Sequence, residues 1–305
     1  MAAETVTDPG RTAYPTYCGW FTEVSPIVGA AVAVVVAFLY GRPTHVMVTT
    51  PMLTVVTGLG ITLGYHRLFA HRSFTTFRSV ERILMILGCM ASIAPFYWIA
   101  MHRAHHRHCD HDGDPHSPHI WAGRRLGLLR GLWHAFFNWL RSQGYSYQVS
   151  AVGHLTRRPD FVWIDRHWYL WYLVGLAIPG LIGFLIGGTA YDALIGFLWG
   201  GLFRHFVVTY TQSMVNTVCH LWGSRPYETT DQSRNNFFVG LIGLGEGWHN
   251  NHHAFPASAR HGFHWWQLDI TWYVIWLMER IGLAWDVKRP HPTCYRAATA
   301  ERAAA

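Results

Sequence analysis

Histidine is the residue type whose number and spacing suggest chemistry, because it makes up 21 of the 305 residues. In two clusters, three histidines lie at positions i, i+3 and i+4, which places them on one face of a helix. A third cluster is a pair five residues apart. This is the wrong spacing for one helix face, so we expect the helix to unwind between its members. A lone histidine after an apolar stretch completes the set. The nine residues are His66, His71, His102, His105, His106, His220, His249, His252 and His253.

A shared metal site explains these histidines better than hydrogen bonding alone. Neutral imidazoles packed together without a metal leave nitrogen lone pairs unsatisfied, and protonating them together is strongly repulsive. Nine imidazoles exceed the four ligands of a closed zinc site, whereas imidazole also suits iron and copper. Two irons that each keep an open position for water or O2 would use nine nitrogens well. The pattern therefore predicts a di-iron centre with O2 as co-substrate.

A carboxylate-bridged metal site is the competing interpretation. Glu246 precedes His249 by three residues and so matches the Glu-x-x-His motif of carboxylate di-iron bundles. Those sites need a second such motif and two further glutamates, and only Glu81 and Glu246 are even loosely placed. We therefore expect Glu246 to accept the N–H of an imidazole and orient it, without binding metal itself.

The other twelve histidines are more dispersed, and a lone histidine near a membrane surface usually bonds to water or headgroups. We expect these residues to be solvated or interfacial. They are His45, His108, His111, His116, His119, His134, His154, His167, His205, His261, His264 and His291.

The composition indicates that lipid is part of the solvent. Half of the residues are apolar and only 13% are charged, against about 25% in a typical soluble domain. Four stretches approach or exceed the roughly 20 residues of helix that cross a bilayer. They predict an all-α integral membrane protein with two helical hairpins and a histidine-rich polar cap. The stretches are residues 24–40, 46–65, 168–188 and 190–218.

The basic residues predict the orientation in the membrane. Of 24 Lys and Arg residues, 22 lie in the N-terminal tail, in residues 67–166 or after His220. The positive-inside rule then places both termini and the histidine clusters in the cytoplasm. The two exceptions are Arg42 in a hairpin turn and Arg204 inside the fourth span, where a buried charge needs a partner or a structural role. We interpret the net charge of +7 as attraction to membrane lipid headgroups, not to nucleic acid.

Three further apolar stretches fit interfacial helices better than membrane crossings. Residues 80–101 contain Glu81, Arg82 and Pro95, and a crossing there would break the charge asymmetry, so we expect a re-entrant or interfacial helix. Residues 126–147 and 265–283 predict two more interfacial helices.

We expect one membrane domain over residues 20–290 between tails 1–19 and 291–305, with disorder up to Thr16 and after residue 296. The five cysteines form no C-x-x-C pair, so neither a disulfide framework nor a rubredoxin-type iron site is indicated.

The histidine motifs and their flanking residues resemble those of the membrane-bound fatty-acyl desaturases, in particular the stearoyl-CoA (acyl-CoA Δ9) desaturase-like branch. The resemblance covers roughly residues 20–290 and rests on combined motifs, because one His-x-x-His-His alone is a weak signal. The motifs are GYHRLFAH (64–71), HRAHH (102–106), DPH (114–116), NTVCHLWGSRPY (216–227) and GEGWHNNHHAFP (245–256).

The resemblance implies two ligand sets and a reaction. One iron would be held by His66, His71, His102, His106 and His252, and the other by His105, His220, His249 and His253 with a water held by Asn216. The reaction would use O2 and two external electrons to insert a cis double bond, expected at Δ9, into a saturated acyl chain. The acyl carrier would be CoA or another acyl carrier such as a lipid. The cytochrome b5 domain fused to some members is absent, so a separate ferredoxin or cytochrome b5 with its reductase would deliver the electrons.

One face of the second span is a candidate wall for a substrate tunnel. Thr54, Gly58 and Thr62 lie at i, i+4 and i+8, one to three helical turns deeper than His66. They fit the far end of a tunnel that holds an extended acyl chain past the irons. Ordinary helix packing explains the same three residues equally well.

Other functions on these residues stay open at this point. A hydroxylase or an acetylenase would share the scaffold and the first oxidising step. A histidine-rich metal transporter is the alternative from another class, although the spans carry almost no polar ligands at the bilayer midplane. The 23 arginines beside the single Lys288 suggest a GC-rich bacterial genome and so the bacterial inner membrane.

Overall fold

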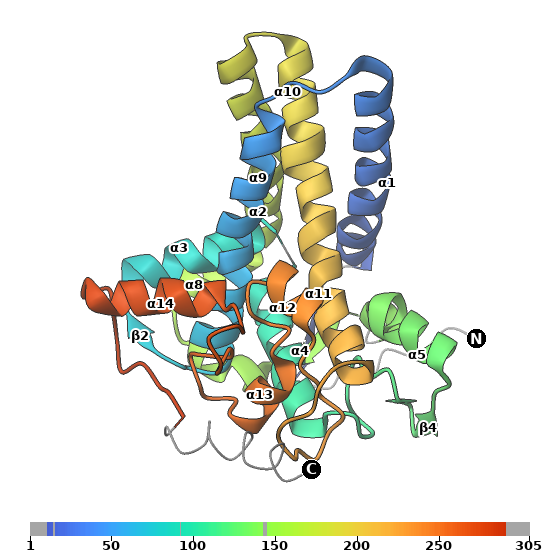
Figure 1. Ribbon diagram of the computed structural model, residues 1–305, viewed down its shortest axis with the longest axis vertical. Helices are drawn as coiled ribbons and strands as arrows, with labels where there is room; N and C mark the ends of the chain where they lie inside the picture. Colours follow the sequence, from blue (N-terminus) through green and yellow to red (C-terminus); the bar gives the residue numbers. More distant parts are fainter. Residues whose placement is uncertain (1–10, 15, 92, 143–144, 291–305) are drawn as a thin grey trace.

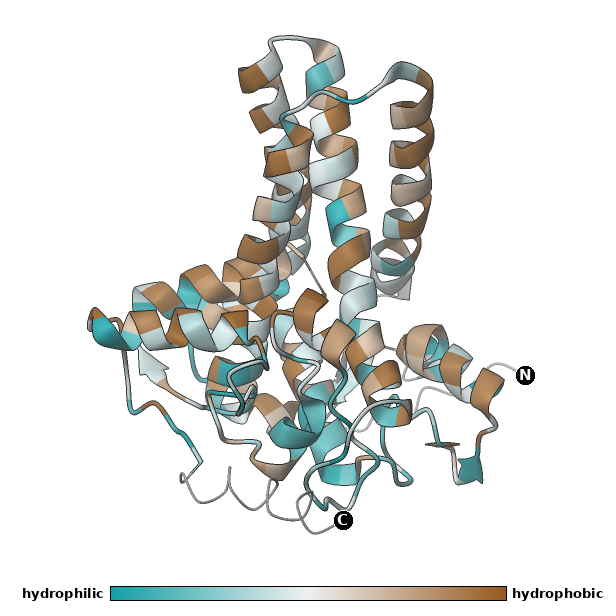
Figure 2. Cartoon of the chain, viewed as in Figure 1, coloured by the Kyte–Doolittle hydropathy of each residue, from teal (hydrophilic) through white to brown (hydrophobic). Residues whose placement is uncertain are grey.

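The structure is a computed structural model that describes residues 11–14, 16–91, 93–142 and 145–290. It has two parts, an upright group of long helices and a cap of short helices and loops at one end (Figure 1). Apolar residues cover the upright helices, whereas hydrophilic residues gather in the cap (Figure 2). This division of polarity is the one expected of a protein that spans a membrane.

In the described ranges, four helices are long and apolar enough to cross a membrane, as predicted. The first is α1 (Thr16–Tyr40). The second is α2 (Val46–Leu59), which continues as the π-helix η1 (Gly60–Ala70). The third is α9 (Trp168–Gly187). The fourth joins α10 (Ala190–Gly196), η4 (Phe197–Phe203) and α11 (Arg204–Leu221). The second runs five residues beyond the predicted end and the fourth three, so His66 and His220 lie on helix and His71 directly follows one. The fold class, all-α and integral to the membrane, is confirmed.

Helices of the cap carry the remaining predicted metal ligands, those of residues 102–106 and 249–253. The predicted interfacial stretch 80–101 forms two helices, α3 (Arg78–Cys89) and α4 (Pro95–His108), with proline at the first turn of α4. Helices α3 and α14 lie across the base of the upright group (Figure 1). The remaining short helices are α5 (Leu128–Trp133), η2 (His134–Asn138), α6 (Trp139–Ser142), η3 (Val149–Val152), α7 (Gly153–Thr156), α8 (Pro159–Arg166), α12 (Phe237–Ile242), α13 (His249–Ala254) and α14 (Ile270–Arg280).

Three short antiparallel strand pairs tie loops of the cap together. They join β1 (Arg11–Ala13) to β5 (Ser146–Gln148), β2 (Thr75–Thr76) to β6 (Ala284–Trp285), and β3 (Ile120–Trp121) to β4 (Arg124–Arg125). The predicted disorder up to Thr16 is therefore wrong for residues 11–13, which are ordered by pairing with a strand far along the chain. The predicted tail 291–305 lies outside the described residues.

Two contacts hold the upright helices to the cap. A Cβ on Gly60 would lie 2.2 Å from the backbone nitrogen of Gly88, so only glycine lets η1 approach α3 this closely. The fully buried Arg204 donates to Thr57 Oγ1 at 2.7 Å and to three backbone carbonyls, those of Met90, Gly175 and Gly200. This buried charge in the fourth span thus has the structural role that the sequence predicts, which is to join α11 to α2 and α9.

Candidate metal centre

Four segments that are distant in sequence bring the nine predicted histidines together in two groups. The ring nitrogens within each group lie within 4.8 Å of one another. The first imidazole cluster consists of His66, His71, His102, His106 and His252, and the second consists of His105, His220, His249 and His253. Helices α4 and α13 contribute to both clusters, whereas η1 serves the first and α11 the second. The memberships equal the two sets implied by the resemblance, and iron binding at them stays a prediction.

The pair His66 and His71 reaches one cluster through a π-helical turn. The backbone N–H of His71 donates to the carbonyl of His66 at 3.0 Å, and the two ring centroids lie 4.8 Å apart. The expectation that the helix unwinds here is wrong. The helix widens instead, and the i to i+5 bond places residues five apart on one face. Such π-helical turns are frequently found at functional sites.

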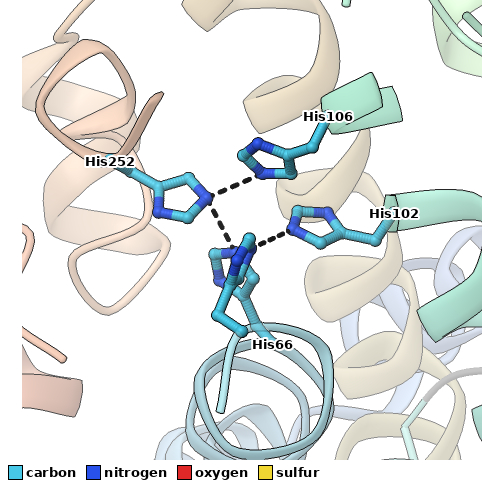
Figure 3. A group of neighbouring side chains, drawn as sticks. His66, His102, His106 and His252 are labelled. Carbon is cyan, nitrogen blue, oxygen red and sulfur yellow. Dashed lines mark hydrogen bonds between the residues drawn. The ribbon is translucent and has the colours of Figure 1, made fainter. Parts of the chain in front are cut away.

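The rings within each cluster point their Nε2 atoms at one another, as Figure 3 shows for four members of the first cluster. The Nε2–Nε2 distances run from 2.7 to 3.1 Å, for the pairs His71–His102, His106–His252, His66–His252, His220–His249 and His249–His253. Burial, with repulsion between neighbouring imidazoles, lowers the pKa well below its usual range at His71, His102, His106, His249 and His252. Converging neutral imidazoles are the donor set that a transition metal needs, so the residues fit the predicted metal.

Carboxylates accept the outward-facing Nδ1 groups of four of these rings. Glu246 Oε2 lies 2.5 Å from His66 Nδ1, the contact expected of an orienting residue. The other three are aspartates, at 2.8–3.0 Å, in the pairs His105–Asp114, His220–Asp110 and His253–Asp231. Sequence reasoning missed these aspartates as site residues. Asp110 and Asp114 follow the second histidine motif closely and gave a local signal, whereas Asp231 gave none.

The electrostatics of the aspartate–histidine pairs favours the ionised form of each aspartate. Burial opposes ionisation of Asp110, but His220 outweighs it and lowers the pKa of the carboxyl well below its usual range. Likewise burial lowers the pKa of His105, but the carboxylate of Asp114 outweighs burial and raises it. Each aspartate is thus ionised and holds its imidazole in the tautomer that leaves Nε2 free for metal.

A buried guanidinium holds Glu246 in place. Arg67 is fully buried, and its Nη2 donates to Glu246 Oε1 at 3.0 Å and to Asp269 Oδ1 at 2.9 Å. Its Nη1 donates to the carbonyl of Ala259 at 2.7 Å. Arg67 follows directly on His66, so one turn of η1 presents both the ligand and the group that fixes the ligand's carboxylate.

Four of the histidines predicted to be solvated or interfacial are buried instead: His116, His134, His205 and His261. His205 is buried inside the helical bundle against Tyr172, and the cap buries the other three, which no local pattern reveals. The ring of His116 lies 4.3 Å from that of His105, and burial lowers its pKa to about 3. The ring of His261 lies 4.4 Å from that of His252, and neither ring nitrogen has a hydrogen-bond partner among the described residues. His291 lies outside the described residues.

Two cavities adjoin the clusters. The first is lined by Trp98, His102 and the predicted water-holding residue Asn216. The second lies between α2, α11 and α12 and is lined by apolar residues with Glu246. The three predicted tunnel residues Thr54, Gly58 and Thr62 also line it. Gln212 lines both cavities, and its Oε1 accepts the Nε1–H of Trp98 at 2.8 Å.

The fold and the site together define an integral membrane protein with two buried imidazole clusters at the end of its helical bundle. A family model for fatty acid desaturases matches residues 43–288, and the chain belongs to the fatty acid desaturase family. The family is generally di-iron and its enzymes are oxidoreductases that act on acyl lipids or acyl-carrier-protein substrates.

Three characterised relatives differ in the carrier of their acyl chain. The chain is 39% identical to a hex-5-enoyl-[acyl-carrier protein] acetylenase of Moorena producens, over 88% of this chain and 84% of the relative. It is also 39% identical to Delta-9 acyl-lipid desaturase 1 of Arabidopsis thaliana, over 77% and 72%. It is 37% identical to an acyl-CoA C20 Delta5-desaturase of Anemone leveillei, over 76% and 70%.

Proposed function

We propose that this desaturase inserts a cis double bond at Δ9 of a saturated acyl chain, using O2 and two external electrons at a di-iron centre. The observation that carries the proposal is the convergence of nine imidazoles in two clusters beside an apolar cavity. His66, His71, His102, His106 and His252 would hold one iron. His105, His220, His249 and His253 would hold the other, with Asn216 holding a water. Bound there, the irons would supply the O2 chemistry that removes two hydrogens from neighbouring methylene groups.

The residues around the site would orient the metal ligands and position the acyl chain for this chemistry. The buried, neutral imidazoles keep their lone pairs free, and the carboxylates behind them fix the ring orientations. The acyl chain would pass His102 and Asn216 in the first cavity and turn at the Trp98–Gln212 contact into the second. Its methyl end would lie against Thr54, Gly58 and Thr62. Holding the chain extended in this way places one pair of carbons beside the metal site.

The partners and the location extend the proposal. The acyl carrier would be CoA, with an acyl lipid as the alternative, and a separate ferredoxin or cytochrome b5 with its reductase would supply electrons. The basic residues support a bacterial inner membrane protein with both termini and the metal site in the cytoplasm. Protease digestion of a tagged terminus tests this orientation. We expect the tag to be digested in inverted membrane vesicles, in which the cytoplasmic face is outside, and to be protected in right-side-out vesicles.

The test is expression in a host that has no desaturase, with the double bond located by mass spectrometry. We expect a cis monounsaturated product and iron in the purified protein. A His252→Ala variant should make no product and keep about half of the iron, because the second cluster stays complete. The acetylenase relative makes acetylenase activity the second candidate, and a triple bond in the product would establish it. A hydroxylated chain would overturn both.

A further inference from the structure

The two imidazole clusters differ in the carboxylates behind them. In the second cluster, three of the four rings donate Nδ1–H to an aspartate, namely Asp110, Asp114 and Asp231. In the first cluster, the described residues give one of the five rings a carboxylate partner, which is Glu246 on His66. The sequence motifs do not show this difference, because both clusters are made of histidine alone.

The two clusters differ in the charge of the groups around their carboxylates as well as in the number of carboxylates. Glu246 shares its charge with the buried guanidinium of Arg67 at 3.0 Å. A second guanidinium, that of Arg103, donates to the carbonyls of Phe69 and Ala70 beside the first cluster. The ion pairs that the described residues give to the three aspartates are all with imidazoles.

The aspartates also have rigid support. Asp110 accepts hydrogen bonds from Ser117 Oγ at 2.7 Å and from the backbone N–H of Gln232 at 2.8 Å. Asp231 accepts from Thr229 Oγ1 at 2.8 Å and from the N–H of Ser233 at 2.9 Å. Their negative charges are therefore held in place, where they make the imidazoles more basic and so better ligands for a metal. Such partners typically change metal affinity by about 10–100-fold each.

We propose that the two metal sites are unequal. The second cluster binds its metal ion more tightly, because Asp110, Asp114 and Asp231 accept hydrogen bonds from its imidazoles. The ion in the first cluster is bound more weakly and is lost before the other. The proposal rests on the metal centre of the proposed function and assigns the three aspartates as positioning residues.

The test is a cobalt(II) titration of the metal-stripped full-length protein in detergent, followed by the absorption of the bound ion. We expect two phases in the wild type, the tighter filled by the first equivalent. Asp231→Asn and Asp110→Asn keep a hydrogen-bond acceptor and remove the charge, so each should weaken the tight phase by about 10–100-fold. Glu246→Gln should weaken only the loose phase. Asp112→Asn is the matched control, because Asp112 is exposed in the same loop and bonds only to the N–H of Gly123 among the contacts described.

A measurement on the wild type alone guards against variants that fold poorly. In the fully loaded protein, a chelator should remove one ion at least tenfold faster than the other. Two ions lost at one rate, or aspartate variants that weaken only the loose phase, would overturn the inequality while leaving the di-iron proposal intact. A wild type that binds no cobalt and no iron would overturn the proposed metal centre itself.

Discussion

The N–H of His71 donates to the carbonyl of His66, five residues earlier, and this one bond brings both rings into the first imidazole cluster. In a regular α-helix, residues five apart lie roughly 140° apart around the axis, since each residue turns the chain by about 100°. The π-helical turn of η1 removes that separation while keeping the backbone hydrogen-bonded at the end of a membrane helix.

His71→Ala tests whether this turn serves a metal. The first cluster would lose one of its five ligands while the second stays complete, so we expect retained iron to fall by about half. Metal analysis of the purified protein measures this. His108→Ala at the exposed end of α4 is the control and should keep full iron. Full iron in His71→Ala would remove His71 from the ligand set.

Arg67→Leu tests the group that fixes Glu246. The substitution leaves the buried carboxylates of Glu246 and Asp269 without their guanidinium. Breaking a buried ion pair in this way costs about 3–5 kcal/mol, so we expect a melting temperature lowered by many degrees and loss of iron. Arg82→Leu removes an exposed ion pair with Asp160 and should cost less than about 1 kcal/mol. Equal melting temperatures for the two variants would contradict the role of Arg67.

Gly58→Leu tests the tunnel. A Cβ on Gly58 would already lie 3.1 Å from Leu244 Cδ1, so a leucine side chain must fill the second cavity. We expect the preferred acyl chain to become shorter, as measured by the products formed from chains of different length. Val56→Leu on the exposed side of the same helix should leave chain length unchanged. An unaltered preference in Gly58→Leu would exclude this wall from the tunnel.

Asp165 predicts a pH dependence of stability. It accepts hydrogen bonds from Tyr14 and the N–H of Phe96, yet burial raises its pKa to about 6, above the usual 3.8. The native state thus binds this proton more tightly than the unfolded state. The stabilisation is complete below about pH 4 and is lost as the pH rises through 6, a difference of about 3 kcal/mol.

Asp165→Asn should therefore gain stability relative to the wild type between pH 5 and pH 8, as followed by thermal melting in detergent. Asp160→Asn in the same helix is the control with the opposite sign. The hydrogen bond from Arg158 lowers the pKa of Asp160, so its contribution is lost only at acid pH, and the difference should stay constant over this range. A constant difference for Asp165→Asn as well would show that Asp165 is ionised throughout.

The sequence by itself determined the four membrane helices, the all-α class and the nine histidines, because hydropathy and the i, i+3, i+4 spacing are properties of short segments. It also indicated that Arg204 has a structural role. Periodicity did not predict the π-helical turn at His71, since an α-helix is the default geometry for any such segment.

Only the tertiary structure decided which histidines meet in each imidazole cluster and which carboxylates accept hydrogen bonds from them. His105 and His106 are neighbours in α4, yet they belong to different clusters, because η1 supplies partners for His106 and α11 supplies a partner for His105. Asp110 and His220 are 110 residues apart and meet at 2.8 Å. Such contacts depend on how helices pack across the whole cap, and no local pattern of residues encodes that distance.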